Sequence, residues 1–103
     1  MKDRYYAVIF TNQLKDQEDI FYQQLSASLR ELAQEQPGYR GLESYRNPDG
    51  AGVTISYWET QDALLAWRKN AEHLVAQQYG KEKAYSHYQV RVCEVFRSYN
   101  SEL

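Results

Sequence analysis

Two histidines and ten tyrosines are the side chains through which this 103-residue chain could do proton or hydrogen-bond chemistry on a small molecule. Histidine is the side chain whose unperturbed pKa suits a base near neutral pH, so His73 and His87 are candidates. A tyrosine ring can stack on a ligand while its hydroxyl donates a hydrogen bond. Four tyrosines are therefore candidates to line a substrate cavity: Tyr6, Tyr57, Tyr85 and Tyr88. The alternative is that these rings fill the core between helices and sheet and a subunit interface.

The sequence lacks the motifs of most metal, nucleotide and covalent chemistry. It has no glycine-rich phosphate loop between a strand and a helix, no G-x-S-x-G turn and no H-E-x-x-H helix. The single cysteine, Cys93, excludes an intramolecular disulfide and a cysteine-rich metal site, and we expect it to be a small buried residue of a strand. The sequence therefore predicts neither a metal site nor a bound cofactor.

Charge and length exclude several classes of partner. Lysine and arginine number 12 and aspartate and glutamate 14, which gives a net charge of −2 and no generally basic surface for nucleic acid. The apolar run of residues 5–10 is too short for a signal peptide or a membrane span, so we expect a cytoplasmic protein with no membrane partner. The length fits a single domain over residues 1–103.

The first half of the chain reads as a strand followed by a long helix. Residues Tyr5–Asn12 are rich in aromatic and β-branched side chains, and both faces of this strand are apolar. Residues Asp16–Gln36 carry leucine and phenylalanine at three- and four-residue spacing, which predicts a helix, and Pro37-Gly38 ends it. A strand that is apolar on both faces must be covered on both sides.

The second half reads as a hairpin, a second helix and a last strand. Strands over Tyr39–Arg46 and Val53–Glu59 flank the turn signal Asn47-Pro48-Asp49-Gly50. Thr60 is a candidate N-cap for the second helix. Lys69-Asn70 is a candidate break in that helix, and Gly80 marks a further interruption. Ser86–Ser98 is the predicted last strand.

The order β-α-β-β-α-β predicts an α+β fold of the ferredoxin-like, split βαβ type, with a four-stranded antiparallel sheet and both helices on one face. Two helices cannot cover both faces of four strands. The last strand also carries Val90 and Val92 on one face and Cys93 and Val95 on the other. The simplest cover for the open face is a second copy of the chain, so we expect a homodimer with sheet facing sheet.

With these elements in place, nearly the whole chain resembles the antibiotic biosynthesis monooxygenase (ABM) domain family of the dimeric α/β-barrel superfamily. The family includes cofactor-free monooxygenases of anthrones, quinol monooxygenases, haem-degrading enzymes and members without known activity, so the resemblance implies a fold more firmly than a reaction. The segments that carry it are YAVIFTNQ, PGYRGLES, RNPDGAG, ISYWETQDALLAWRKNAEHL and YSHYQVRVCEV.

The resemblance implies a role for Trp67, because anthrone oxygenases of the family carry a helix tryptophan. Their tyrosine six positions later is His73 here, their asparagine four positions earlier is Ala63, and their basic residue near the last strand falls around His87. Such a set would stabilise the oxyanion of an electron-rich aromatic substrate in a dry pocket. Trp67 can equally be a core residue. An unbroken helix would turn His73 to water, and a break near Asn70 would turn it toward a pocket.

Asn12 is a candidate because of the resemblance to the haem-degrading members of the family. These carry an asparagine near this position, a helix tryptophan and a histidine ten positions after that tryptophan. The last of these positions is Gln77 here, a poor ligand for haem iron. The alternative for Asn12 is a turn residue at the end of a strand.

Three hypotheses follow. The first is a cofactor-independent monooxygenase that oxidises a small, electron-rich aromatic such as a quinol or anthrone, with Trp67, His73 and Asn12 as catalytic residues and Tyr6, Tyr57, Tyr85, His87 and Tyr88 as substrate-binding residues. The second is a non-catalytic, small-molecule-binding or stress-associated dimer. The third is haem binding.

Overall fold

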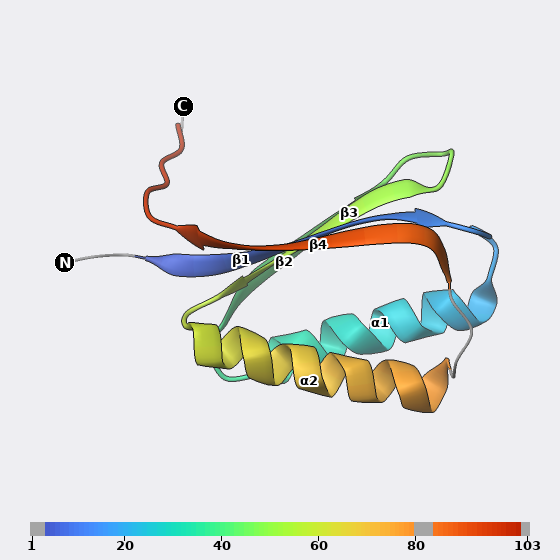
Figure 1. The fold of residues 1–103 in the computed structure, drawn as a ribbon, viewed down its shortest axis with the longest axis horizontal. Helices are drawn as coiled ribbons and strands as arrows, with labels where there is room; N and C mark the ends of the chain where they lie inside the picture. The colour runs from blue at the N-terminus through green and yellow to red at the C-terminus, as the bar shows by residue number, and fades with distance from the viewer. Residues whose placement is uncertain (1–3, 80–83, 102–103) are drawn as a thin grey trace.

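The computed structural model describes residues 4–79 and 84–101. Its elements follow the order β-α-β-β-α-β (Figure 1). They are β1 (Tyr5–Leu14), α1 (Ile20–Glu35), β2 (Tyr39–Arg46), β3 (Ala51–Trp58), α2 (Gln61–Gln78) and β4 (Tyr85–Val95).

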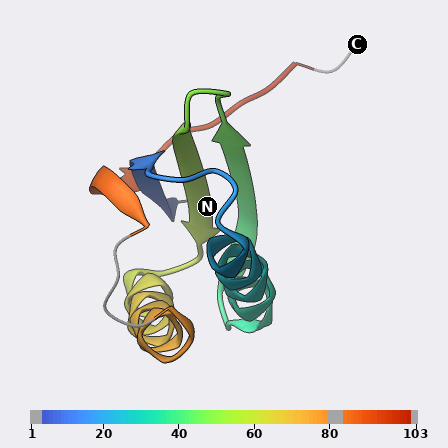
Figure 2. The ribbon, with the colours of Figure 1, turned by 90° about the vertical axis from the view of Figure 1, so that its right-hand side faces the viewer.

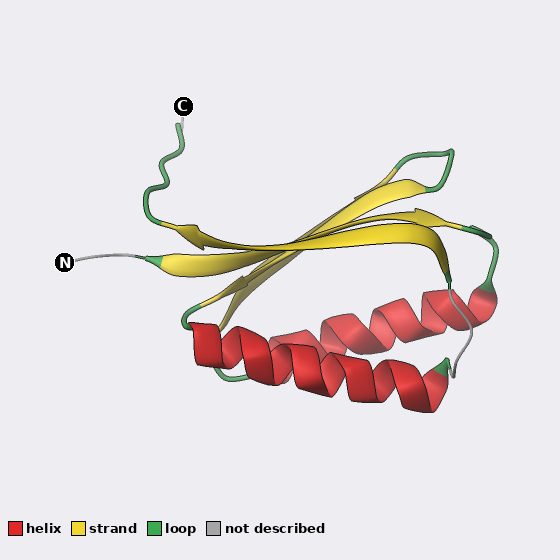
Figure 3. Cartoon of the chain, in the orientation of Figure 1, coloured by secondary structure: helices red, strands yellow, loops and turns green. Residues whose placement is uncertain are grey.

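The four strands form one antiparallel sheet in the order β2-β3-β1-β4. Both helices lie on the same face of this sheet (Figures 2 and 3), with α1 against β2 and α2 against β1 and β3. The first strand is an inner strand, between β3 and β4, and one of its two apolar faces packs beneath the helices while the other lies on the open face of the sheet. The predicted α+β, ferredoxin-like fold is confirmed.

The first helix starts four residues later than its sequence pattern predicts. Asp19 is the N-cap, and its Oδ1 accepts hydrogen bonds from the backbone N–H groups of Phe21 (3.0 Å) and Tyr22 (3.1 Å). The Tyr79 hydroxyl donates to the other carboxylate oxygen of Asp19, which ties the end of α2 to the start of α1. Asp16 instead accepts from the backbone of Glu18 in the turn before the helix.

Of the two alternatives at Lys69-Asn70, the unbroken helix is the one observed, because α2 is one continuous helix of 18 residues. Asparagine weakens a helix by competing for nearby backbone groups. Here the Asn70 amide donates to the side chain of Gln36, 2.9 Å away, and leaves the helix ladder intact. The second expected interruption, at Gly80, lies outside the described residues.

The last strand is Tyr85–Val95 rather than Ser86–Ser98. Its final residue, Val95, pairs with Tyr5, the first residue of β1, so the chain beyond Val95 has no strand beside it. The third strand begins at Ala51 rather than at the predicted Val53. The reason is that β1 continues past the predicted end at Asn12, so that Gln13 pairs with Ala51.

The core lies between the helices and one end of the sheet. Ala33 of α1, Leu64 of α2 and Trp58 of β3 form its buried centre, and Trp58 is fully enclosed. The Trp58 indole N–H donates to Ser56 Oγ at 2.9 Å, so burial leaves it no unmet hydrogen bond. Trp67 stacks on Trp58 with ring centres 5.6 Å apart.

The register divides the sheet residues between two faces. Tyr6 and Val8 pack against the core, so they and the positions that alternate with them, Phe10 and Asn12, face the helices. Their neighbours in β4 are Val92 opposite Val8 and Val90 opposite Phe10, whereas Cys93 and Val95 lie on the opposite, open face. Across the described residues, neither helix is long and apolar enough to cross a lipid bilayer.

Candidate functional site

A row of four residues crosses the helix-facing side of the sheet at the end away from Trp58. Arg46 of β2 pairs with Gly52 of β3, Gly52 pairs with Asn12 of β1, and Asn12 pairs with Tyr88 of β4. Directly paired residues point to the same face, so these side chains share the side that carries the helices.

Arg46 is half-buried and reaches along this row to Asn12. Its Nη1 donates to Asn12 Oδ1 (2.5 Å) and to the carbonyl of Gly50 (2.7 Å), and its Nη2 donates to the Tyr22 hydroxyl of α1 (3.3 Å). All three acceptors are neutral. In the part of the chain that the structure describes, no carboxylate forms an ion pair with Arg46.

Gly52 gives the guanidinium the space it occupies. A Cβ built on Gly52 would lie 2.5 Å from Arg46 Nη1 and 2.6 Å from its Cζ. Glycine in a strand is unfavourable unless another group approaches the backbone closely, and here that group is the Arg46 side chain.

Two tyrosine hydroxyls extend the hydrogen-bonded chain from Arg46. The hydroxyl of Tyr22 lies 2.8 Å from that of Tyr85, and their rings meet edge to face. Burial, followed by the hydrogen bond with Tyr22, raises the pKa of the Tyr85 phenol well above its usual value. The phenol of Tyr85 is therefore protonated across the physiological pH range.

The Asn12 side chain is 5% exposed, and its amide nitrogen, Nδ2, is a buried donor with no hydrogen-bond partner among residues 4–79 and 84–101. Buried donors are normally paired, and one left unpaired costs roughly 1–3 kcal/mol. The oxygen of the same amide, Asn12 Oδ1, accepts a hydrogen bond from Arg46. The amide therefore cannot flip to pair Nδ2 without losing that bond.

Aromatic rings stand beside Asn12 on the same face. The ring centre of Phe10 lies 5.2 Å from that of Tyr85 and 5.6 Å from that of Tyr88. Beyond them the helix-facing side of β4 is uncovered, because the helices pack against the other three strands. Tyr88, Val90 and Val92 are 62%, 49% and 56% exposed. The row thus ends in an accessible apolar surface, which we call the β4 strip (Tyr88, Val90 and Val92).

The site residues taken from the sequence fall in four places. Asn12, Tyr85 and Tyr88 come together beside Arg46. Trp67 and Tyr6 pack at the core around Trp58. The Tyr6–Trp58 pair lies six residues along β1 from the Asn12–Gly52 pair, about 20 Å at ~3.3 Å per residue.

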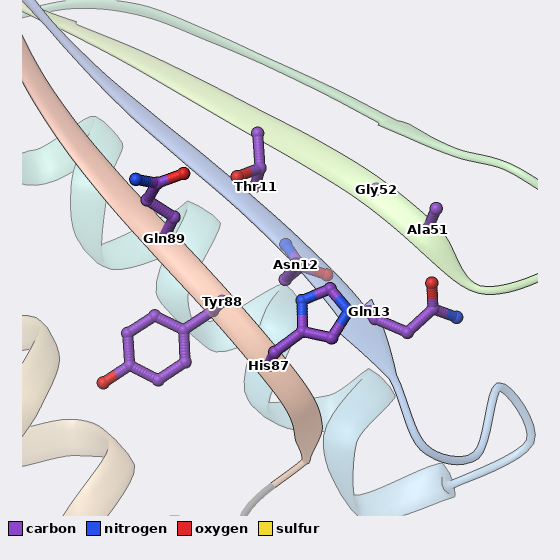
Figure 4. Close-up of a pocket in the computed structure, with 8 residues that line it drawn as sticks. All are labelled: Thr11, Asn12, Gln13, Ala51, Gly52, His87, Tyr88 and Gln89. Carbon is purple, nitrogen blue, oxygen red and sulfur yellow. The ribbon is translucent and has the colours of Figure 1, made fainter.

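The two histidines do not join Asn12 on the helix-facing side. His73 is exposed on the unbroken α2. His87 pairs with Gln13 on the open face, where it helps to line a hollow of about 490 Å³. Figure 4 shows this hollow, with the sheet in front of the helices. Its other lining residues are Thr11, Asn12, Gln13, Ala51, Gly52, Tyr88 and Gln89. The hollow therefore shares Asn12, Gly52 and Tyr88 with the row, but neither Arg46 nor Tyr22 lines it.

Tyr57 also lies on the open face. Its hydroxyl donates to Glu43 Oε2 at 2.7 Å, and Tyr45 donates to the other oxygen of the same carboxylate at 3.0 Å. The hydrogen bond with Glu43, together with desolvation, raises the pKa of Tyr57 to about 12, and the same bond lowers the pKa of Glu43. Tyr57 is thus engaged across β2 and β3 rather than aimed at the helices.

The Tyr57–Glu43 bond predicts an alkaline loss of stability. Because the folded pKa of Tyr57 lies above its ordinary value of 10.0, its stabilising contribution is complete below pH 10.0 and is lost as the pH rises through about 12. We expect the free energy of unfolding, measured by urea titration, to fall across this window less steeply in Tyr57→Phe than in the wild type. Equal slopes in the two proteins would contradict the assignment, and Tyr99→Phe, at an 86% exposed position, is the matched control.

Three residues of the site are not among the candidates that the sequence pattern provides: Tyr22, Arg46 and Gly52. A signal for two of them was present. Once the Asn47–Gly50 turn fixes the hairpin, Arg46 falls close to Gly52 on the neighbouring strand, and a glycine within a strand marks the close approach of another group. Tyr22 gave no such signal, because its role depends on how α1 lies against the sheet. Among the described residues, no group of three His, Cys, Asp or Glu side chains is placed to hold a metal ion.

The fold and the polar row define a ferredoxin-like α+β protein whose edge strand, β4, exposes Tyr88, Val90 and Val92 on the side of the sheet that carries the helices. The chain belongs to the antibiotic biosynthesis monooxygenase family, whose model matches residues 4–79.

The relatives of the chain agree with this assignment. It is 43% identical over 93 residues to the uncharacterised protein YqjZ of Bacillus subtilis, an alignment that covers 90% of this chain and 81% of YqjZ. It is 28% identical over 98 residues to the jasmonate monooxygenase ABM of Pyricularia oryzae, covering 93% of this chain and 46% of that protein. A variant of SnoaB, a cofactor-independent oxygenase from Streptomyces nogalater, has the same fold, with a TM-score of 0.72 at 15% identity over 93% of this chain and 96% of SnoaB.

Proposed function

We propose that the chain is a cofactor-independent monooxygenase that oxidises a small, electron-rich aromatic of the quinol or anthrone type on the helix-facing side of its sheet. The observation that carries the proposal is the arrangement around Asn12. An unpaired buried donor, Asn12 Nδ2, lies at the end of an accessible aromatic surface. Membership of a family that includes a jasmonate monooxygenase and the shared fold of SnoaB support the reaction class.

The chemistry needs a deprotonated substrate and a donor for its oxyanion. For an anthrone, one oxygen atom of O₂ becomes the new carbonyl oxygen, and the other leaves as water with the two hydrogens of the oxidised carbon. The substrate supplies all four electrons, so no separate reductant enters the balance. Asn12 would stabilise the negative charge on the substrate oxygen as O₂ reacts, in a site where burial strengthens that hydrogen bond.

The other proposed residues have distinct parts. Tyr85 and Tyr88 would bind the substrate ring. Trp67, half-buried on Trp58, would close the apolar end of the surface. His73, His87, Tyr6 and Tyr57 stay candidates from the sequence pattern alone, and His73 would act from an exposed position on α2.

Haem degradation is a poor fit to the residues present. The position expected to ligate the iron is Gln77, whose amide is a weak ligand, and it is exposed near the end of α2. Gln77 therefore does not favour a haem-degrading activity. A binding protein without turnover is the alternative that the activity test separates.

Oxygen uptake with a panel of anthrones and quinols tests the proposal. We expect one O₂ consumed per substrate, kcat/KM lowered roughly tenfold (~1.4 kcal/mol) in Trp67→Phe and more strongly in Asn12→Leu. A loss in His73→Ala would assign the base to His73, whereas the exposed Leu65→Ala is the matched control on the same helix. Saturable binding without oxygen uptake across the panel would leave a binding module and end the proposal of an enzyme.

A second copy of the chain on the open face is part of the same proposal. Ile9, Val53 and Ile55 are apolar and only half-buried there in the single chain. Burying them against their symmetric equivalents would also enclose the hollow that His87 lines.

The homodimer predicts a solution mass of twice 12.2 kDa by sedimentation or light scattering. We expect Ile9→Asp to halve that mass, because it places a charge in the centre of the open face. Leu65→Asp, at an exposed position of α2, should leave the dimer intact. A wild-type mass of 12.2 kDa at micromolar concentration would refute the sheet-to-sheet dimer.

A further inference from the structure

We propose that Asn12, Tyr22, Arg46 and Tyr85, here called the donor cluster, form an anion receptor that selects aromatic ligands carrying a carboxylate or an ionised phenol. The proposal rests on the proposed function in placing the substrate at Asn12. It goes beyond that function because it names the charge of the ligand. It also assigns the preference for that charge to Arg46, which occupies the space that Gly52 leaves.

The donor cluster has unused hydrogen-bond donors, whereas its acceptor atoms already accept bonds from within the cluster. Arginine has five N–H groups and no acceptor, and Arg46 uses three of them. Asn12 Oδ1 is occupied by Arg46, while Asn12 Nδ2 is unused. Tyr22 and Tyr85 share one hydrogen bond, so one of their two hydroxyl protons is left over whichever of them donates. What the cluster can still offer a ligand is mostly N–H and O–H, which recognise a negatively charged oxygen.

Charge reinforces this preference. Arg46 is half-buried, and throughout the described ranges it has hydrogen-bond acceptors but no carboxylate as a counter-ion. Its donation to Asn12 Oδ1 also polarises the Asn12 amide, which strengthens Nδ2–H as a donor. An anion accepting from Nδ2 would supply the missing negative charge.

The neighbouring side chains specify the rest of the ligand. Phe10 and Tyr88 stand beside Asn12, and the β4 strip continues as an exposed apolar surface. An aromatic ring lying on this surface would direct an attached oxyanion toward the donor cluster. A small inorganic anion would gain nothing from these rings.

Calorimetric titration of the purified protein with 2-naphthoate and its neutral isostere 2-naphthamide tests the proposal. We expect the carboxylate to bind at least roughly tenfold more tightly, which is ~1.4 kcal/mol. 4-Nitrophenol supplies the phenol arm, because binding of the ionised form would raise the fraction of yellow phenolate at fixed pH. Whichever anion binds tightly shows whether the receptor prefers a carboxylate or an ionised phenol. Equal binding of naphthoate and naphthamide, together with an unchanged nitrophenol spectrum, would overturn the proposal.

Asn12→Asp is the decisive variant. Its carboxylate keeps an acceptor for Arg46, so the fold should be retained, as the thermal midpoint would verify, but it removes Nδ2 and adds a negative charge. We expect naphthoate binding to fall by at least tenfold while naphthamide binding changes by less than threefold. Naphthoate binding that survives Asn12→Asp would contradict the proposal. Anion selectivity without oxygen uptake would leave the receptor standing and count against the monooxygenase alone, so the two failures are distinguishable.

Discussion

Replacing Gly52 with alanine is expected to displace the Arg46 guanidinium from the donor cluster. Although the substitution adds only one methyl group, we expect it to destabilise the protein by about 2–3 kcal/mol. The new Cβ would lie 2.5 Å from Arg46 Nη1, so the guanidinium must leave its place over the strand. Its bonds to Asn12, Gly50 and Tyr22 would be lost together, and Asn12 Oδ1 would become a second unpaired buried atom. Urea unfolding gives the stability, and titration with 2-naphthoate gives the loss of binding.

The double variant Arg46→Ala/Gly52→Ala provides the control, because it separates the clash from the intrinsic effect of alanine. Gly52 has no positive φ, and alanine in a strand is favoured over glycine by roughly 0.5–1 kcal/mol. Once the guanidinium is removed, the same Gly52→Ala change should therefore be neutral or stabilising. The coupling between the two substitutions would then exceed about 2 kcal/mol, beyond what independent sites show. If the two effects simply add, the packing of Arg46 on Gly52 is not what stabilises the row.

Trp58→Ala is expected to be the most destabilising single substitution in the described core, by about 3–5 kcal/mol. Trp58 is fully enclosed, stacks on Trp67 and meets Tyr39 edge to face at 5.8 Å. Its removal would leave a large cavity and an unpaired Ser56 hydroxyl. Total stabilities of small domains are about 5–15 kcal/mol, so the variant should be close to unfolding at room temperature.

Thermal unfolding followed by near-ultraviolet circular dichroism measures this effect directly, since Trp58 and Trp67 are the two tryptophans of the chain and stack on each other. We expect the near-ultraviolet signal to collapse along with the unfolding midpoint. Leu65→Ala, which removes an apolar side chain that is 53% exposed, should change the midpoint little. A cost for Trp58→Ala as small as that of Leu65→Ala would mean that the tryptophan pair is not the centre of the core.

The fold was largely accessible from local patterns. Alternating and helical periodicity, the Asn47–Gly50 turn and the apolar faces of the first strand predict the element order, and that order has one economical sheet topology. The errors are at element ends, where tertiary contacts decide. Asp19, rather than Asp16, caps α1 because its carboxylate also binds Tyr79 from the end of α2. Asn70 sits within an unbroken helix because Gln36 takes its hydrogen bond.

The candidate site was accessible only in part. The sequence singled out Asn12, Tyr85 and Tyr88 by residue type and resemblance, and these three do meet beside Arg46. It grouped His87 and Tyr57 with them, and the register puts both on the open face instead. Side-chain direction alternates along a strand, so a shift of one position moves a residue to the other side of the sheet, and a pattern that is apolar on both faces does not say which side carries the helices.

The sequence by itself determined which elements form, that one sheet face lacks a helical cover, and that the chain resembles the ABM family. These properties are encoded locally, in periodicity, turn residues and composition. Only the tertiary structure decided that Arg46 lies over Gly52, that Asn12 keeps a buried donor unpaired among the described residues, and that the helices leave the β4 strip uncovered. Those features depend on strand register and helix placement, which bring together residues as distant in the sequence as Asn12 and Tyr88 and which no local pattern specifies.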